Sequence, residues 1–79
     1  MTRAEHIAWA KARALEYLDS DRINAAQLAA ASIASDLAKY DGDDLGVSPR
    51  DVAIGTVDAI LRNPGNEIAA MRAFVEELK

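Results

Sequence analysis

Apolar side chains recur along this chain at the spacing of an α-helix, and they divide it into four amphipathic segments. In the first segment, about 2–19, alanine and aliphatic residues return every three or four positions and so share one side of a helix. The same period recurs over about 22–40, 48–62 and 66–78. No internal repeat or long linker divides the chain. We therefore predict an all-α fold, a compact bundle of four short helices that forms a single domain over residues 1–79.

Local signals mark where these helices begin. Thr2 followed three positions later by Glu5 is the pattern of a capping box. Ser48 followed by Pro49 supplies an N-cap and a proline at the first helical position, where the missing N–H has no helical partner to lose. The run Asn63–Asn66 places proline and glycine at the two central positions of a type II turn. Its last asparagine is predicted to cap the fourth helix.

The buried faces are built largely from small residues. The chain has 17 alanines, as many as its isoleucines, leucines and valines together, so we expect the helices to pack closely on alanine. The face predicted for the second helix consists of Ile23, Ala26, Ala30, Ile33, Ala34, Leu37 and Tyr40. The face predicted for the fourth consists of Ile68, Met71, Phe74, Val75 and Leu78. Met71 and Phe74 are interpreted as core residues.

The third segment is apolar around most of its circumference. Its apolar residues are Val52, Ala53, Ile54, Val57, Ala59, Ile60 and Leu61. A polar seam of Gly55, Asp58 and Arg62 interrupts them. A helix of this kind is predicted to lie at the centre of the bundle or at a subunit contact. Glycine in a helix interior costs about 1 kcal/mol relative to alanine, so Gly55 is predicted to mark a close backbone approach.

Composition and charge exclude several classes of function. The chain has no cysteine, which removes disulfides and thiolate zinc sites. No apolar run approaches the length of a membrane span, and the charged N-terminal segment does not have the pattern of a signal peptide. The net charge of -4 disfavours general nucleic-acid binding, which needs a basic face. The cytoplasm is the expected location.

The sequence offers no persuasive catalytic or metal-binding arrangement. A single histidine, His6, and the absence of cysteine leave no nucleophilic triad. The acidic run Asp41–Val47 is similar to the start of a calcium loop, but Leu45 and Val52 occupy the fifth and twelfth positions, where ligands are needed. We interpret it as a solvated turn. The chain is therefore predicted not to be an enzyme and to hold no metal or cofactor.

A second stripe on the first helix is the strongest indication of function. It carries His6, Trp9, Arg13, Glu16 and Tyr17. Tryptophan, tyrosine and arginine are the residues that protein interfaces use as anchors, so we predict that this stripe binds a partner protein. The alternative is that another helix of the same chain covers Trp9, in which case the stripe belongs to the core.

The run from His6 to Asp19, His-x-x-Trp-x-Lys-x-Arg-Ala-Leu-Glu-Tyr-Leu-Asp, resembles the start of small uncharacterised proteins of tailed bacteriophages, including those of actinobacteria. The similarity continues in Asn24-Ala25, around Ser35 to Lys39, and in Met71 to Glu76. This family brings no established activity. The resemblance implies a phage gene product that acts in the infected bacterial cytoplasm.

Together these observations predict a non-enzymatic phage accessory protein that binds a host or phage protein through the first helix. A self-assembling structural homo-oligomer, such as a homodimer, is the alternative. A regulator associated with nucleic acid is the third and weakest possibility, because the charge disfavours it. No membrane association is expected.

Overall fold

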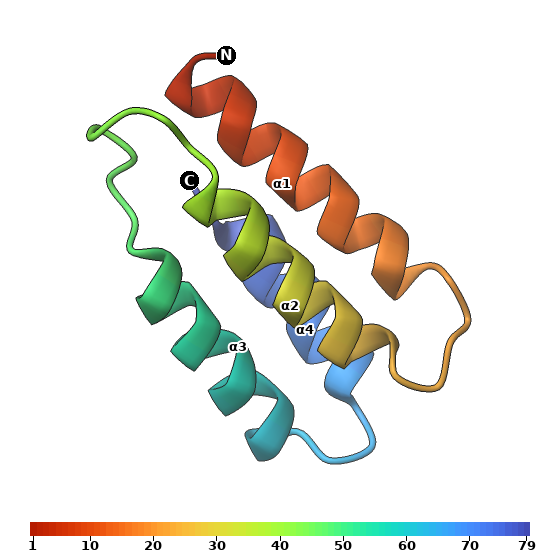
Figure 1. Ribbon diagram of the computed structural model, residues 1–79. Coiled ribbons are helices and arrows are strands. Elements are labelled where there is room, and N and C mark those ends of the chain that lie inside the picture. Colours follow the sequence, from red (N-terminus) through yellow and green to blue (C-terminus); the bar gives the residue numbers. More distant parts are fainter.

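Four helices make up the protein, in a computed structural model that describes residues 1–79. They are α1 (Arg3–Leu18), α2 (Ala25–Ala38), α3 (Pro49–Arg62) and α4 (Glu67–Glu77). Consecutive helices run antiparallel (Figure 1), and the molecule measures 36 × 21 × 17 Å along its principal axes. The predicted all-α bundle of four short helices is confirmed. No helix is both long and apolar enough to cross a membrane.

The predicted helix starts at Thr2 and Ser48 are confirmed. The Thr2 hydroxyl accepts a hydrogen bond from the Glu5 amide at 3.1 Å, and the Glu5 carboxylate accepts one from the Thr2 amide at 2.8 Å. Both halves of the capping box are thus present. The Ser48 hydroxyl accepts from the Asp51 amide at 3.3 Å, with Pro49 at the start of α3. These bonds satisfy amides that the first helical turn leaves without a backbone partner.

The second helix begins at the later of the two starts that the pattern allowed, Asp21 and Asn24. Residue Asp21 takes a left-handed backbone conformation, with φ at 59°, and α2 starts at Ala25 with Asn24 as N-cap. Ile23 therefore lies outside the helical period and is fully exposed, so its assignment to the buried face of the second helix was wrong. A left-handed residue cannot be part of a right-handed helix, so Asp21 lies outside α2.

The predicted turn before α4 is confirmed. Gly65 has φ at 83°, the value that the third residue of a type II turn requires, and the Asn66 amide donates to the Asn63 carbonyl at 2.9 Å. Asn66 is the N-cap of α4, as predicted, but its side chain makes no capping hydrogen bond.

The core lies where α1, α2 and α4 meet. α2 packs against each of the other three helices, whereas α1 and α3 do not contact each other. In Figure 1, α1 and α3 accordingly flank α2, with α4 behind it. Ala10 and Ala14 of α1 and Ala29 of α2 have no exposed surface, so the expectation of close packing on alanine holds. The larger fully buried aliphatic side chains are Ile33, Leu37, Met71 and Val75.

The third helix does not occupy the centre of the bundle, and that part of the prediction was wrong. Val52 and Thr56 are its only buried residues, whereas Ile54, Val57 and Leu61 are exposed by 58, 54 and 74%. The reason is the topology: α3 packs on α2 and α4 alone, and two neighbours cover one side of a helix. The other environment predicted for this helix, a subunit contact, exists only between two chains and stays a prediction.

The close approach predicted at Gly55 is present, although the neighbour is a side chain rather than backbone. A Cβ atom on Gly55 would lie 2.7 and 2.8 Å from the Cε2 and Cζ atoms of Phe74. Such distances are shorter than carbon atoms tolerate, so glycine is what lets the aromatic ring of α4 sit against α3. Met71 is fully buried and Phe74 is partly buried against the core.

Candidate protein-binding surface

The five residues of the predicted α1 stripe do not share one environment. His6 is buried, Trp9 and Tyr17 are half-buried, and Arg13 and Glu16 are exposed. Trp9 and Tyr17 pack with part of their surface on the core. The stripe therefore lies at the boundary between the α1–α2 joint and solvent: part of it packs on the core, and part of it is exposed.

His6 is a structural residue of the α1–α2 joint rather than a surface residue. Its Nε2 atom lies 2.6 Å from the backbone carbonyl oxygen of Asp36. A carbonyl oxygen only accepts, so Nε2 carries the proton and donates it. The imidazole also lies 5.2 Å from the Trp9 ring and 5.1 Å from the Tyr40 ring, centroid to centroid. His6 is thus the buried member of the predicted stripe.

Asp36 is the buried partner that the sequence analysis missed. Its carboxylate accepts from Arg13 Nε at 2.7 Å, from Ser32 Oγ at 3.3 Å and from Lys39 Nζ at 3.3 Å. Burial by itself would raise the pKa of Asp36, but hydrogen bonds from Arg13 and Lys39 outweigh it and hold that pKa below its ordinary value. The sequence contained a signal for this ion pair, because an acidic residue on the buried face of a helix requires a cationic partner.

Arg13 links this buried carboxylate to the indole of Trp9. Its guanidinium carbon lies 5.3 Å from the centroid of the Trp9 ring, which is the geometry of a cation–π contact. The hydrogen bond to Asp36 raises the pKa of Arg13, so the side chain stays charged. Trp9 and Arg13 consequently lie together as one aromatic and cationic edge.

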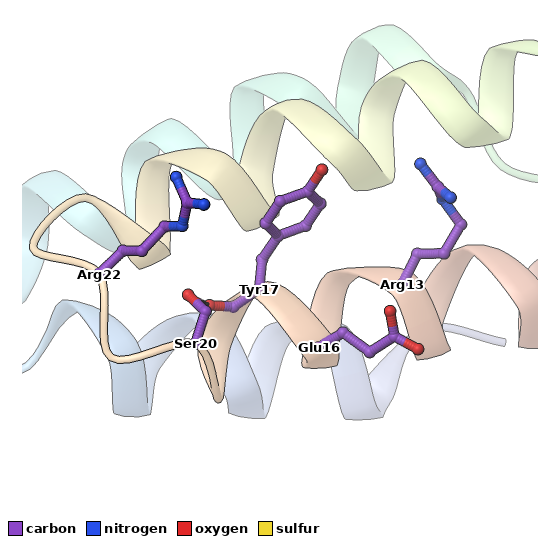
Figure 2. Close-up of a pocket in the computed structure, with 5 residues that line it drawn as sticks. All are labelled: Arg13, Glu16, Tyr17, Ser20 and Arg22. Carbon is purple, nitrogen blue, oxygen red and sulfur yellow. Dashed lines mark hydrogen bonds between the residues drawn. The ribbon is translucent and has the colours of Figure 1, made fainter.

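Beyond Arg13 the surface is hollowed into an open pocket of about 290 Å³. It is lined by Arg13, Glu16, Tyr17, Ser20 and Arg22, the residues drawn in Figure 2. In that view Arg13, Tyr17 and Arg22 extend to the same side of α1, toward α2, whereas the Glu16 carboxylate lies away from them. Three residues of the predicted stripe therefore line one concave site.

Ser20 and Arg22 belong to this site, although the sequence analysis did not assign them to it. They follow the end of α1, and the chain turns back there so that Arg22 returns beside Tyr17 (Figure 2). The Ser20 hydroxyl donates to the Tyr17 carbonyl at 2.6 Å, which tightens this turn. The guanidinium of Arg22 has no hydrogen-bond or ion-pair partner within the chain. No sequence period could place it, because it lies in a loop.

The acidic side chains of the loop after α2 do not come together as a group of metal ligands. The structure contains no group of three or more acidic, histidine or cysteine side chains able to hold a metal ion. One of the loop carboxylates, Asp44, instead accepts a hydrogen bond from the Tyr40 hydroxyl at 2.7 Å. This bond raises the pKa of Tyr40.

Comparison with protein-family models, with curated proteins and with solved structures found no match for this chain. The phage resemblance therefore rests on the residues quoted for it, and function has to be argued from the surface itself.

Proposed function

We propose that this protein is a non-catalytic protein-binding module that docks a partner through the pocket at the end of α1 and the Trp9–Arg13 edge beside it. The observation that carries the proposal is that Arg13, Glu16 and Tyr17 line one pocket. These are three of the five residues selected from sequence for their interface chemistry. Aromatic and arginine side chains that are already positioned lose little conformational freedom on binding.

The charges of the pocket favour a partner that presents a carboxylate beside an apolar side chain. Asp36 neutralises much of the charge of Arg13, but Arg22 has no partner within the chain. An acidic side chain could pair with the guanidinium of Arg22 in the fork geometry that arginine provides. The half-buried ring of Tyr17 offers the adjoining apolar contact. The resemblance to phage proteins supports an infected bacterial cell as the setting of this interaction.

Photocrosslinking tests the proposal. Benzoylphenylalanine placed at Glu16 should give a discrete protein adduct in extracts of phage-infected bacteria. Mass spectrometry then identifies the partner, and its dissociation constant is measured. We expect Arg22→Glu to weaken binding at least about tenfold, because repulsion replaces a charged hydrogen bond worth about 1.5–3 kcal/mol.

The matched control is Arg50→Glu, the same charge reversal at an exposed residue in the first turn of α3, away from the pocket. It should leave the dissociation constant unchanged. Equal weakening by both variants would show a general electrostatic effect rather than a site. An adduct that Arg22→Glu does not affect would contradict the assignment of the pocket. Arg22 is exposed, so circular dichroism should show unchanged helicity in both variants.

A further inference from the structure

We propose that the exposed face of α3 is the contact surface of a symmetric homodimer in which the two α3 helices pack antiparallel. This surface lies across the bundle from α1, so the inference is independent of the function proposed for the α1 pocket.

The central observation is an uncovered aliphatic stripe on α3. Ile54, Val57 and Leu61 follow one another at intervals of three and four residues, so they project from one side of the helix. They are exposed by 58, 54 and 74%. The buried residues Val52 and Thr56 lie on the opposite side. Three large aliphatic side chains that gather on one helix face mark an interaction surface more strongly than isolated ones do.

An apolar groove continues this stripe toward α2. Its volume is about 300 Å³, and it is lined mainly by Ala30, Ala31, Ala34, Ala53, Val57 and Ile60. Val57 belongs to both the stripe and the groove. A partner helix laid on the stripe could therefore place aliphatic side chains in the groove, which widens the contact beyond one row of residues.

The charges beside the stripe indicate that the partner is a second copy. Asp51 and Arg62 lie near opposite ends of α3 and, eleven residues apart, on nearly the same edge of it. A two-fold axis that passes between the two α3 helices, at the level of residues 56 and 57, brings position 51 of one copy opposite position 62 of the other. It keeps each edge against the same edge of the partner, as an isologous interface requires. Arg62 Nε already donates to Asp58 of its own helix at 2.7 Å, so the remaining guanidinium N–H groups of each copy face Asp51 of the other, at both ends of the contact.

The same axis also interleaves the aliphatic side chains. Along the shared direction, Leu61, Ile54 and Val57 of one copy alternate with those of the other, which is the interdigitation that helix packing needs. A parallel two-fold pair would instead place this edge of the two copies on opposite sides of the contact, so that Asp51 of one copy would not meet Arg62 of the other. Exposed ion pairs contribute about 0–1 kcal/mol each, so the aliphatic contact supplies the affinity and the charges select the orientation.

The interface is small, and the dimer should be weak. A contact formed by a single 14-residue helix and the adjoining groove lies at the low end of specific interfaces. We therefore expect a dissociation constant above about 1 µM. Sedimentation velocity from about 10 µM to 1 mM should show the sedimentation coefficient rising from monomer to dimer.

Leu61→Glu should leave the protein monomeric throughout this range, because it places a charge in the apolar contact. Leu61 is 74% exposed, so circular dichroism should show that the variant remains folded. The matched control is Ile23→Glu, which changes an equally apolar, fully exposed residue before α2. This variant should dimerise like the wild type. A wild type that is monomeric at 1 mM overturns the proposal, and so does a dimer that Leu61→Glu does not weaken.

The orientation is tested separately with cysteines, which the natural chain lacks. We expect a mixture of Asp51→Cys and Arg62→Cys proteins to form mostly the mixed disulfide under mild oxidation, because antiparallel helices bring position 51 of one copy to position 62 of the other. Predominant pairing of each variant with itself would overturn the antiparallel arrangement.

Discussion

The residue that joins α1 to α2 is Asp36. Its carboxylate is buried, and it accepts hydrogen bonds from Arg13 of α1 and from Ser32 and Lys39 of α2. Its backbone carbonyl accepts from His6. A buried charge is tolerated when it is paired and hydrogen-bonded, and here the partners come from two helices. Asp36 therefore fixes how the α1 stripe sits against α2, and with it the positions of Trp9 and Arg13.

We predict that Asp36→Asn lowers the free energy of unfolding by about 1–3 kcal/mol at pH 7, because the buried site loses charge-assisted hydrogen bonds. Solvent reaches Arg13, which screens this interaction and favours the lower half of that range. The folded-state pKa of Asp36 is depressed, so its stabilisation is complete above the unfolded-state pKa of about 3.9 and is lost as pH falls through the folded-state pKa. The difference between wild type and variant should shrink below about pH 4 in urea unfolding experiments.

Asp43→Asn provides the control, because Asp43 lies exposed in the loop after α2 and makes no hydrogen bond within the chain. It should change stability at pH 7 by less than about 0.5 kcal/mol. If Asp36→Asn were as mild as this control, Asp36 would not be the residue that holds the two helices together.

At the scale of elements, the contact between α3 and α4 depends on one glycine. Gly55 lets the Phe74 ring approach the α3 backbone more closely than any side chain would allow. Phe74 in turn packs against the core. Glycine lowers the helix propensity of the α3 interior, and the packing of the Phe74 ring offsets this loss.

We predict that Gly55→Ala destabilises the protein by about 1 kcal/mol, although alanine is the better helix former. Helix propensity favours alanine by about 1 kcal/mol, but displacement of a packed ring typically costs about 1–3 kcal/mol. In a Phe74→Leu background the ring is absent, and the same substitution should become neutral or stabilising. Thermal unfolding of the four proteins forms a double-mutant cycle. A stabilising effect of Gly55→Ala in the wild-type background would show that the ring relaxes freely.

At the scale of the whole molecule, the two ends of the chain are tied together. Arg3 donates from Nη2 to the Lys79 carbonyl at 2.9 Å and from Nε to the Leu45 carbonyl. Lys11 Nζ donates to the Leu78 and Glu76 carbonyls at 2.8 and 3.1 Å, so a cation sits at the negative end of the α4 dipole. Both termini lie at the same end of the bundle (Figure 1).

This arrangement predicts that the chain tolerates circular permutation. A permutant that joins Lys79 to Met1 through a short glycine-serine linker and opens before Gly65 should keep the helicity and the cooperative unfolding of the wild type. The Gly65 turn is open, with no atoms where a side chain would point. Opening between Ala30 and Ala31, inside α2, should abolish folding, since α2 contacts every other helix. Circular dichroism and urea unfolding compare the two permutants. If the permutant opened before Gly65 did not fold, the α3–α4 connection would contribute to stability beyond joining the two helices.

The sequence by itself determined the elements, because their causes are local. Apolar periodicity defined four helices, and the Thr2, Ser48 and Asn63–Asn66 signals act over three or four residues, so they could be read without the fold. Periodicity did not decide between Asp21 and Asn24 as the start of α2, because the left-handed conformation of Asp21 has no periodic signature.

The tertiary structure alone decided which faces are covered, because burial depends on how many neighbours each helix has. In the tertiary structure His6 is buried beside the Asp36 carbonyl, and Arg22 lies beside the end of α1. The aliphatic stripe of α3 remains exposed at the edge of the bundle. The hydrophobic pattern indicates which residues a helix can bury, whereas the topology determines which of those residues neighbouring helices cover. For this protein, that difference separates the residues that hold the bundle together from those available to bind.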